Sequence, residues 1–521
     1  MKKLYYGAKF LTLSDNGYAE AMLVDGDKIA AIGSYEDVAR VSGECEHEDL
    51  GGVTVMPGFI DAHGHFPNVA ADFAHASFRG VRSIEEMKER IAAHIKNNAV
   101  PDGSWIVAKG YDENLLPGHA HPSIAELDDM SPDNPLYVSH TSGHAGLYNS
   151  AALKLLGVDD DTPSPDGNIV KKNGKLTGYM LEGANSRLCA KIPPVSNEIL
   201  ARNCIKAQEK YASYGITTVQ DGYATKRIFS ILNDLSKQGL LKLDVIGYAP
   251  AKFYTEVARW FSEQDMAKNI RLGGIKSFID GSPQLRTAFL RTPYLNSDDC
   301  GSPVRTYESL VDVMRLSSQS RAQAIIHSNG DMAIEWFLNA LEEVSAEDPS
   351  VKELRPVIIH GQLMGLDQLP RAKELGAIVS FFVAHTYHFA DAHIRNLGID
   401  RARLISPTRS ALKEGVIFTF HQDPPVIEQD MFETVWCAAN RITRDGVSLS
   451  GEEIDVIDAI RAVTVSAAYQ YGEEDIKGSL ETGKLADFIV IDRDPLEIPK
   501  EELRDVKILR TYKNGELIFN A

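Results

Sequence analysis

The sequence predicts an α/β fold: a (β/α)8 barrel of the TIM type, a small β-sandwich domain assembled from both chain termini, and an insertion after the first barrel strand. Three observations predict it. Short apolar runs alternate with amphipathic helical segments through the middle of the chain, which is typical of a parallel sheet covered by helices. Strand and turn patterns occupy both ends, and the length of 521 residues exceeds that of a minimal barrel.

Both ends of the chain have the pattern of short strands and turns. β-Branched and aromatic residues fill KLYYGAKFLTLS and AEAMLVDGDKIAAIGS near the start, and GKLADFIVIDRDP and DVKILRTYKNGELIFNA near the end. The Asp-Gly and Asn-Gly pairs within them are hairpin-turn signals. We therefore expect residues 1–56 and 473–521 to form one composite β-sandwich domain.

The barrel is expected over residues 57–472. The segment SNEILARNCIKAQEKYASYG is typical of an amphipathic helix that ends at Gly215, and ITTVQDG follows it as a strand. Further short apolar runs are KLDVIGYAP, RLGGIKSFIDG, QAIIHSNGD, PVIIHGQ, AIVSFF and VIFTFHQD. So many helix–strand repeats favour a closed barrel over an open sheet.

Residues from about 67 to 194 fit this alternation poorly and are expected to form the insertion. The stretch is rich in Asp, Pro, Gly and Ser, which favour turns and loops. It contains one strong helix signal, because Ser83 and Glu86 open SIEEMKERIAAHIKNN with the spacing of a capping box.

Charge, cysteine content and hydropathy exclude several classes of protein. The net charge of −19, with no long basic run, argues against nucleic acid as a partner. The five cysteines are scattered without a CxxC pair, which favours a reducing compartment. No apolar run approaches the roughly 18 residues that a membrane helix needs, and the N-terminus is a poor signal peptide. We expect a cytoplasmic protein without membrane contact.

Polar residues fall at the ends of the predicted barrel strands. PGFIDAHGH places His63 and His65 two positions apart just after a strand, so both side chains leave the same side of an extended chain. The strands further along the chain contribute Lys276, His327, His360, His421 and Asp423. In a parallel barrel such strand ends converge on the face that carries the active site. Imidazole and carboxylate suit zinc and related metals, so the set predicts a metal site.

Each of these residues has an ordinary structural explanation when it is taken singly. A lone strand-end histidine is commonly a hydrogen-bonded structural residue. Lys276 could extend its amine to solvent at the rim of the barrel. Asp423, which precedes two prolines, could be part of a turn. The joint pattern of residue types, order and strand ends favours a metal centre over these explanations.

The sequence resembles the amidohydrolase superfamily over nearly its whole length. PGFIDAHGH near the start and GKLADFIVID near the end are together a specific pairing for that superfamily. The segments LDDMSPDNPLYVSHTSGHAGLYNSAAL and FFVAHTYHFADAH resemble the branch of N-substituted formamide deformylase-like proteins, the amidohydrolase 3 type. HQDPPV departs from the HSDAPV that is usual in this branch, which leaves the substrate open.

The resemblance implies one or two divalent metal ions per chain, zinc before others. The implied ligands are His63, His65, Lys276, His327, His360 and Asp423. Lys276 would bridge as a carbamate formed with carbon dioxide, because a buried lysine readily loses its proton. Asp423 would also be the catalytic base that takes a proton from the metal-activated water.

Further residues in the matching motifs are candidates for contact with the substrate or the ligands. The candidate substrate contacts are Tyr111, Asp112, His144, Glu182, His385, His388 and His421. Asp331 in HSNGD is expected to orient the ring of a ligating histidine. Structural hydrogen bonding is the alternative for each of them.

The function implied by the resemblance is metal-dependent hydrolysis of a non-peptide carbon–nitrogen bond in a small amide, formamide or cyclic amide. Hydrolysis of an ester or carbamate, or a deamination, remains an alternative on the same scaffold. A non-catalytic binding or regulatory barrel is another, but such proteins usually lose metal ligands, and here all six are present. The expected partner is a small-molecule substrate, and the resemblance favours a homodimer or a larger assembly of this chain.

Overall fold

The computed structural model describes residues 2–15, 17–140, 145–164 and 168–521, which form two compact units. Unit 1 comprises Met1–Pro67 and Ile205–Ala521, and unit 2 comprises Asn68–Cys204. The chain therefore leaves unit 1 once and returns to it.

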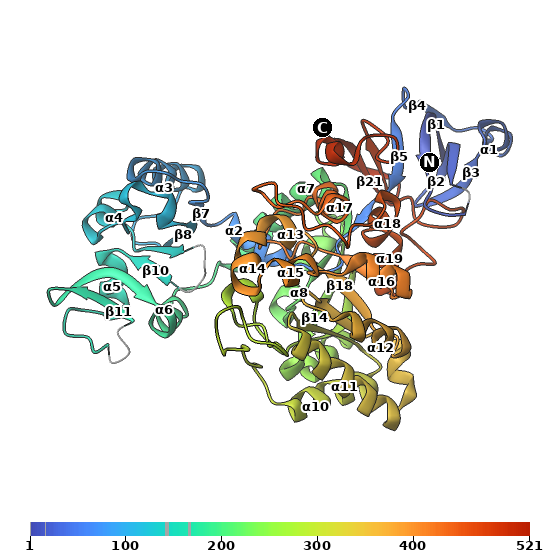
Figure 1. The fold of residues 1–521 in the computed structure, drawn as a ribbon. Coiled ribbons are helices and arrows are strands. Elements are labelled where there is room, and N and C mark those ends of the chain that lie inside the picture. Colours follow the sequence, from blue (N-terminus) through green and yellow to red (C-terminus); the bar gives the residue numbers. More distant parts are fainter. Residues whose placement is uncertain (1, 16, 141–144, 165–167) are drawn as a thin grey trace. The chain divides into compact units, whose positions relative to one another are not determined.

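Eight strands form the central sheet of unit 1 (Figure 1). They are β6 (Phe59–Ile60), β13 (Ile216–Asp221), β14 (Asp244–Pro250), β15 (Ile270–Phe278), β16 (Gln323–Ser328), β17 (Val357–His360), β18 (Ile378–Phe381) and β19 (Phe418–Phe420). Their spatial order is β19-β18-β17-β16-β15-β14-β13-β6, and every neighbouring pair is parallel. Each apolar run that the sequence assigned to a barrel strand is confirmed as a strand of this sheet.

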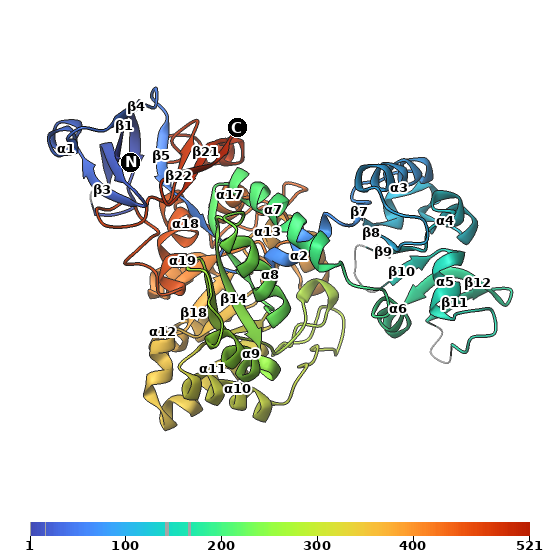
Figure 2. The ribbon, with the colours of Figure 1, turned by 180° about the vertical axis from the view of Figure 1, so that it is seen from behind.

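Helices connect these strands and pack along the sheet (Figures 1 and 2). Apolar spacing explains the packing: α8 buries Phe229, Ile231, Leu232 and Leu235 on one face. The helices are α7 (Asn197–Ser213), α8 (Lys226–Lys237), α9 (Tyr254–Ser262), α10 (Tyr307–Ser320), α11 (Asp331–Glu347), α12 (Leu369–Glu374), α13 (His385–His388), α14 (Ala390–Leu397), α15 (Ile399–Arg403), α16 (Thr408–Glu414), α17 (Met431–Asn440), α18 (Val456–Ala462) and α19 (Val465–Gln470). In the ranges that the structure describes, no helix has the length and apolar character needed to cross a membrane.

The parallel sheet curls until its first and last strands approach each other. The Gln470 side chain, at the end of α19, donates from Nε2 to the carbonyl oxygen of Ala62 (2.7 Å), which follows β6. Its Oε1 accepts from the Thr419 hydroxyl of β19 (2.8 Å). The backbone N–H of His65 also donates to the carbonyl of Pro424 (3.0 Å). The predicted barrel is thus observed as a curled parallel sheet whose two ends are joined through these bonds.

Strands from both chain ends form a second sheet in unit 1. The strands are β1 (Lys2–Leu11), β2 (Tyr18–Asp25), β3 (Lys28–Gly33), β4 (Glu46–Asp49), β5 (Thr54–Pro57), β20 (Phe488–Ile491), β21 (Ile508–Lys513) and β22 (Glu516–Asn520), and helix α1 (Tyr35–Ser42) follows β3. The order is β22-β21-β20-β5-β1-β2-β3, with β4 beside β1. Val55 of β5 lies opposite Val490 of β20, so the two chain ends are paired directly (Figure 1). A separate β-sandwich domain stays a prediction.

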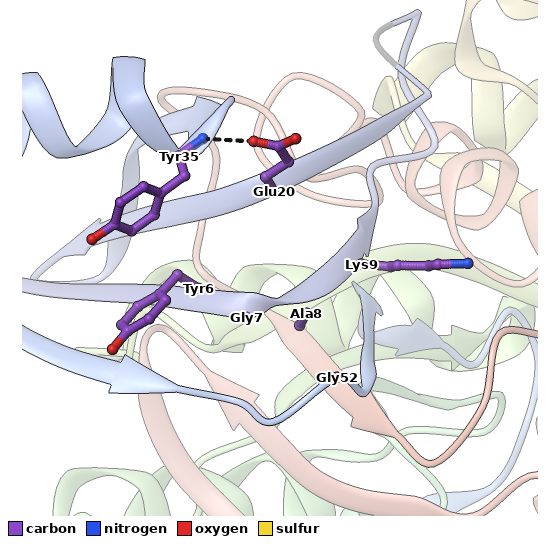
Figure 3. A pocket seen from close by; sticks show the side chains of 7 residues that line it. All are labelled: Tyr6, Gly7, Ala8, Lys9, Glu20, Tyr35 and Gly52. Atoms are coloured by element: carbon purple, nitrogen blue, oxygen red, sulfur yellow. Dashed lines mark hydrogen bonds between the residues drawn. The ribbon is translucent and has the colours of Figure 1, made fainter.

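A shallow hollow of about 600 Å³ lies on this second sheet, beside β1 (Figure 3). The rings of Tyr6 and Tyr35, 5.4 Å apart, line it together with Glu20 and Lys9. Glu20 already accepts the backbone N–H of Tyr35 (3.1 Å), and Lys9 is paired with Glu497. The hollow therefore presents mainly apolar surface.

Unit 2 contains a six-stranded mixed sheet with its own helices. The strands are β7 (Ala76–Ser77), β8 (Ile106–Tyr111), β9 (Leu136–His140), β10 (Ala145–Tyr148), β11 (Ile169–Lys172) and β12 (Lys175–Leu181). The helices are α2 (Phe66–Asp72), which begins in unit 1, α3 (Ile84–Asn98), α4 (Ile124–Met130), α5 (Ser150–Leu156) and α6 (Glu182–Cys189). The order β11-β12-β10-β9-β8-β7 is parallel only among β7, β8 and β9.

The predicted helix of the insertion starts where its capping signal placed it. Ser83 precedes α3 and its hydroxyl accepts the backbone N–H of Glu86 (3.1 Å). The Glu86 carboxylate accepts from the backbone of Arg82 rather than from Ser83. Only one half of the capping box is therefore formed, and it is sufficient to define the first turn.

Candidate metal centre

The six predicted metal ligands meet at the carboxyl-terminal edge of the barrel sheet. They come from the loop after β6 (His63, His65), β15 (Lys276), β16 (His327), the end of β17 (His360) and the loop after β19 (Asp423). All are buried or half-buried. The parallel direction of the strands explains the convergence, because their carboxyl ends share one edge.

Asp423 lies at the centre of this set. Its Oδ1 is 3.3 Å from Nε2 of His65 and 3.6 Å from Nε2 of His63, and its Oδ2 is 3.9 Å from Nε2 of His360. One ligand atom from each of His63, His360 and Asp423 lies within 4.8 Å of the other two. Among the described residues, the buried Oδ1 of Asp423 has no hydrogen-bond donor. A buried carboxylate oxygen without a donor is suited to a cation, so these residues fit a metal ion.

Lys276 is buried beside the first histidine pair. Its Nζ lies 3.2 Å from Nε2 of His63, and the side chain is 2% exposed. Burial lowers the pKa of Lys276 to about 8, although the Asp423 carboxylate opposes the shift. The amine therefore loses its proton far more readily than a surface lysine does.

His327 and His360 form the second histidine pair. Nδ1 of His327 lies 3.0 Å from Nε2 of His360. Nε2 of His327 lies 2.9 Å from the carbonyl oxygen of Gly281, which can only accept a hydrogen bond. Nε2 also lies 3.0 Å from Nδ2 of Asn329, so an acceptor and a donor both contact this nitrogen.

Two of the central residues have a strained backbone conformation. His360 has φ 76° and Asp423 has φ 53°, in the left-handed region that side chains other than glycine rarely adopt. Such a conformation costs on the order of 1–3 kcal/mol and persists where the surrounding structure enforces it, commonly at functional sites.

Electrostatics keep His63, His327 and His360 neutral and the carboxylate ionised, whereas the Asp423 carboxylate outweighs the burial of His65 and raises the pKa of that ring. Burial lowers the pKa of His63 and His360 well below the ordinary value and that of His327 to about 4. Burial alone would raise the pKa of Asp423, but the neighbouring His63 and His65 bring it well below its usual range. Neutral imidazole and ionised carboxylate are the forms that bind a metal.

Gln220 orients His63 and was not singled out from the sequence. Its Nε2 donates to the carbonyl of Ala62 (2.8 Å) and to the hydroxyl of Tyr471 (2.9 Å), which fixes the amide orientation. Its Oε1 therefore accepts from Nδ1 of His63 (2.6 Å), leaving Nε2 of His63 free to bind a metal. The signal was available, because Gln220 is a polar residue near the end of the apolar strand ITTVQDG.

His421 is placed behind the cluster rather than at its surface. The side chain is fully buried. Its Nε2 lies 3.0 Å from Nδ1 of His360, and its Nδ1 lies 2.8 Å from the hydroxyl oxygen of Ser380. Both ring nitrogens therefore contact protein groups.

The other two candidate histidines of unit 1 lie outside the ligand cluster. His385 is buried, with Nδ1 3.1 Å from Nε2 of His393. His388 is paired through Nε2 with the carboxylate of Glu433, and its Nδ1 accepts from the Arg444 guanidinium (2.8 Å). Their role in substrate contact stays a prediction.

Asp331 contacts backbone rather than a histidine ring. Its Oδ1 accepts the N–H groups of Arg291 (2.8 Å) and Met332 (3.1 Å) at the start of α11. Two other carboxylates lie near predicted ligands: Oδ1 of Asp221 is 3.9 Å from Nδ1 of His65, and Oδ1 of Asp280 is 3.7 Å from Nε2 of His327. Burial raises the pKa of Asp280 to about 7. The sequence pattern therefore did not locate this carboxylate.

The remaining candidates belong to unit 2. Tyr111 ends β8 and its hydroxyl is 2.6 Å from Nδ1 of His121. Asp112 lies in a group with Glu113 and His140 whose ligand atoms are within 4.8 Å of one another. His144 lies outside the described residues, as does the side chain of Glu182.

The similarity to known proteins extends over almost the entire chain. The model of the amidohydrolase family matches residues 46–519. N-substituted formamide deformylase of Arthrobacter pascens is 29% identical over 540 aligned residues, which cover 97% of this chain and 95% of that protein. Putative amidohydrolase YtcJ of Bacillus subtilis is 26% identical, covering 100% and 99%. The crystal structure of an uncharacterized metal-dependent hydrolase from Pyrococcus furiosus is 25% identical with a TM-score of 0.80, covering 95% and 100%.

Proposed function

Since the chain belongs to the amidohydrolase family and is a metal-dependent hydrolase, we propose that it cleaves a non-peptide carbon–nitrogen bond in a small amide, formamide or cyclic amide. The name of the deformylase from Arthrobacter pascens supports this bond class. The observation that carries the proposal is the convergence of His63, His360 and Asp423 at one edge of the barrel.

The proposed centre holds one or two zinc ions. His63 and His65 form one pair of ligands and His327 with His360 the other, and the Asp423 carboxylate faces both pairs. Neutral histidines with a carboxylate suit zinc. When bound, the metal ion supplies Lewis-acid chemistry, lowering the pKa of a water molecule and polarising a carbonyl group.

Lys276 is proposed to bridge the two ligand pairs as a carbamate. Its neutral amine would form a nitrogen–carbon bond with carbon dioxide and release one proton. The low pKa and the burial of Lys276 favour the neutral amine. The new carboxylate would add a negative charge and two oxygen ligands beside His63.

Asp423 is proposed as the catalytic base. It would take a proton from the attacking water as the new carbon–oxygen bond forms, and deliver that proton to the nitrogen as the carbon–nitrogen bond breaks. The products would be a carboxylic acid and an amine. Its low pKa keeps the carboxylate ready to accept, and its partial exposure leaves it accessible to substrate.

The test is a substrate panel on protein of measured metal content. The panel contains N-substituted formamides, other N-acyl amines and cyclic amides, with matched esters, carbamates, aminopurines and dipeptides as competitors. We expect about one to two zinc ions per chain and turnover of at least one amide class. The His63→Ala variant should lose both metal and turnover.

Three outcomes would contradict the proposal. Full activity in metal-free protein would exclude the metal centre. Turnover confined to esters, carbamates or deamination would retain the centre and replace the bond class. Tight substrate binding without turnover in zinc-loaded protein would indicate a non-catalytic barrel.

A further inference from the structure

His421 occupies an unusual position at the end of β19. It is fully buried, and its ring lies 5.1 Å from that of His360 and 5.2 Å from that of His63. The pairing of β18 with β19 aligns Ser380 with Thr419, two positions before His421. This register brings the Ser380 hydroxyl within 2.8 Å of Nδ1 of His421.

The three groups Ser380, His421 and His360 form a chain of hydrogen bonds. Nδ1 of His360 is 3.0 Å from Nε2 of His421. Both rings are buried beside the imidazole of His63, and a buried ring among other imidazoles is least costly in its neutral form. A neutral imidazole has one N–H donor and one acceptor nitrogen, so the bonds of the chain must all run in one direction.

The ligand role of His360 selects that direction. If Nε2 of His360 presents its lone pair to a metal, its hydrogen must be on Nδ1, and that N–H donates to Nε2 of His421. The hydrogen of His421 is then on Nδ1 and donates to the Ser380 oxygen. Nδ1 of His360 and both nitrogens of His421 have hydrogen-bond partners in this arrangement, and Nε2 of His360 faces Asp423 and His327.

We propose that His421 is a positioning residue that fixes the tautomer and the ring orientation of His360, with Ser380 as the last acceptor. The inference rests on the proposed metal centre, in which His360 is a ligand. It assigns His421 neither to the substrate nor to the metal, because both of its nitrogens are occupied by protein partners. A partner on the far nitrogen of a ligating histidine raises its basicity and restricts its rotation.

The backbone of His360 shows why such a partner is needed. With φ 76°, this residue ends β17 in a strained conformation, so the strand geometry alone does not hold the ring direction. The polar contacts of its ring are to His327, His421 and Asp423. Of these three groups, only His421 lies on the Nδ1 side.

The experiment compares metal affinity in five variants, one of which, Ser380→Ala, removes the last acceptor of the hydrogen-bond chain. His421→Phe removes the acceptor and nearly conserves volume, whereas His421→Gln offers an amide oxygen near the position of Nε2. The matched control is His393→Phe, since His393 is also fully buried and bonded through one nitrogen to a histidine ring. His360→Ala removes the ligand itself. Affinity is measured by competition with a chelator, and the ligand geometry by the absorption spectrum of the cobalt-loaded protein.

We expect His421→Phe to weaken metal binding about 10–100-fold and to change the cobalt spectrum. His421→Gln should recover most of that loss, and His393→Phe should bind metal as the parent does. Ser380→Ala should show a smaller loss in the same direction. The thermal unfolding midpoint of each variant is measured as well. If His421→Phe and His393→Phe lose stability equally but only His421→Phe loses metal affinity, the loss of affinity is not a consequence of destabilisation.

The outcomes distinguish a failure of the positioning role of His421 from a failure of the proposed metal centre. Unchanged metal affinity and spectrum in His421→Phe, with metal loss in His360→Ala, would overturn the positioning role alone. Loss of a whole metal equivalent in His421→Phe, without recovery in His421→Gln, would make His421 a ligand and also overturn it. Full metal content in His360→Ala would instead contradict the proposed centre.

Discussion

The side chains at the strand ends are of two kinds: those that could bind a metal ion, and those that orient the metal-binding side chains. His63 and His360 each have one nitrogen directed toward Asp423 and the other bonded to a protein group, Gln220 for His63 and His421 for His360. The tautomer of each ring therefore follows from the amide or ring behind it.

Replacement of Asp423 by Asn separates metal binding from proton transfer. The amide keeps an oxygen ligand but cannot take a proton from water. We expect Asp423→Asn to retain most of its metal and to lose about 10²–10⁴-fold in kcat. Metal analysis and steady-state kinetics measured on the same preparation check this, and an Asn variant with parental kcat would remove Asp423 from the role of base.

Replacement of Lys276 by Ala tests the carbamate. We expect Lys276→Ala to lose metal and activity, and short carboxylic acids such as acetate or propionate to restore part of both by filling the space of the lost carboxylate. The matched control is Lys477→Ala, which removes another buried lysine and should gain nothing from the added acid. Restoration in both variants, or in neither, would argue against a carboxylated Lys276.

The sequence predicted the residue types of the site better than their partners. A histidine or aspartate at the end of an apolar strand is visible as a pattern, and all six such ligands converge. Gln220 and Ser380 are also polar residues in apolar strands. Their importance depends on which ring nitrogen they contact, and that is decided by tertiary packing. The HSNGD motif favours Asp331 as the carboxylate that orients a ligating ring, whereas the carboxylate 3.7 Å from Nε2 of His327 is that of Asp280.

At the scale of elements, a buried ionic network joins the barrel to the sheet of the chain ends. Asp244 starts β14, and its carboxylate contacts Lys477 and Lys513 of β21. Lys513 also pairs with Asp487 (2.7 Å). The side chains of both lysines are 2% exposed. Removal of one partner would leave buried charge without compensation, which is the costly case for such networks.

Asp244→Asn should destabilise unit 1 by about 3–5 kcal/mol at pH 7. Burial raises the pKa of Asp244, but Lys477 and Lys513 more than offset this and lower it. The stabilisation is therefore complete above the unfolded pKa, about 3.9, and is lost as the pH falls through the folded pKa.

Urea unfolding of parent and variant at pH 7 and near pH 3 checks this prediction. The difference in unfolding free energy should be large at pH 7 and smaller in acid. Asp265→Asn is the control, since Asp265 is 94% exposed in its pair with Lys237 and should cost less than about 1 kcal/mol. Equal effects of the two substitutions would show that the network contributes little.

Strands were predictable because each is a short apolar run bounded by polar residues, and β13 to β19 all lie where such runs occur. The six-stranded sheet of residues 76–181 was not predicted. Its strands are short and mixed in direction, and turn-forming residues between them suppress the periodic signal.

At the scale of the whole chain, the proposed metal ligands belong to unit 1 alone, and each unit has an apolar core of its own. Binding to the folded state stabilises it by about 2.7 kcal/mol at a free metal concentration one hundred times Kd. We therefore expect two thermal transitions, of which a chelator lowers only that of unit 1, by several degrees.

Differential scanning calorimetry with and without a chelator measures these transitions, and limited proteolysis during heating assigns them to the units. The His63→Ala variant serves as the control, because its transitions should not respond to the chelator. A chelator shift of both transitions, or of the unit 2 transition alone, would contradict the assignment of the metal to unit 1.

The contacts that connect the ends of the curled sheet, β6 and β19, also determine when during protein synthesis the site can form. His63 follows the first strand of the curled sheet and Asp423 follows the last, while Gln470, which bonds to both ends, comes later still in the sequence. A chain that is still on the ribosome has its histidines long before it has the carboxylate at their centre. Metal capture by the complete site is therefore one of the last events of biosynthesis, and a truncated product would lack the proposed base.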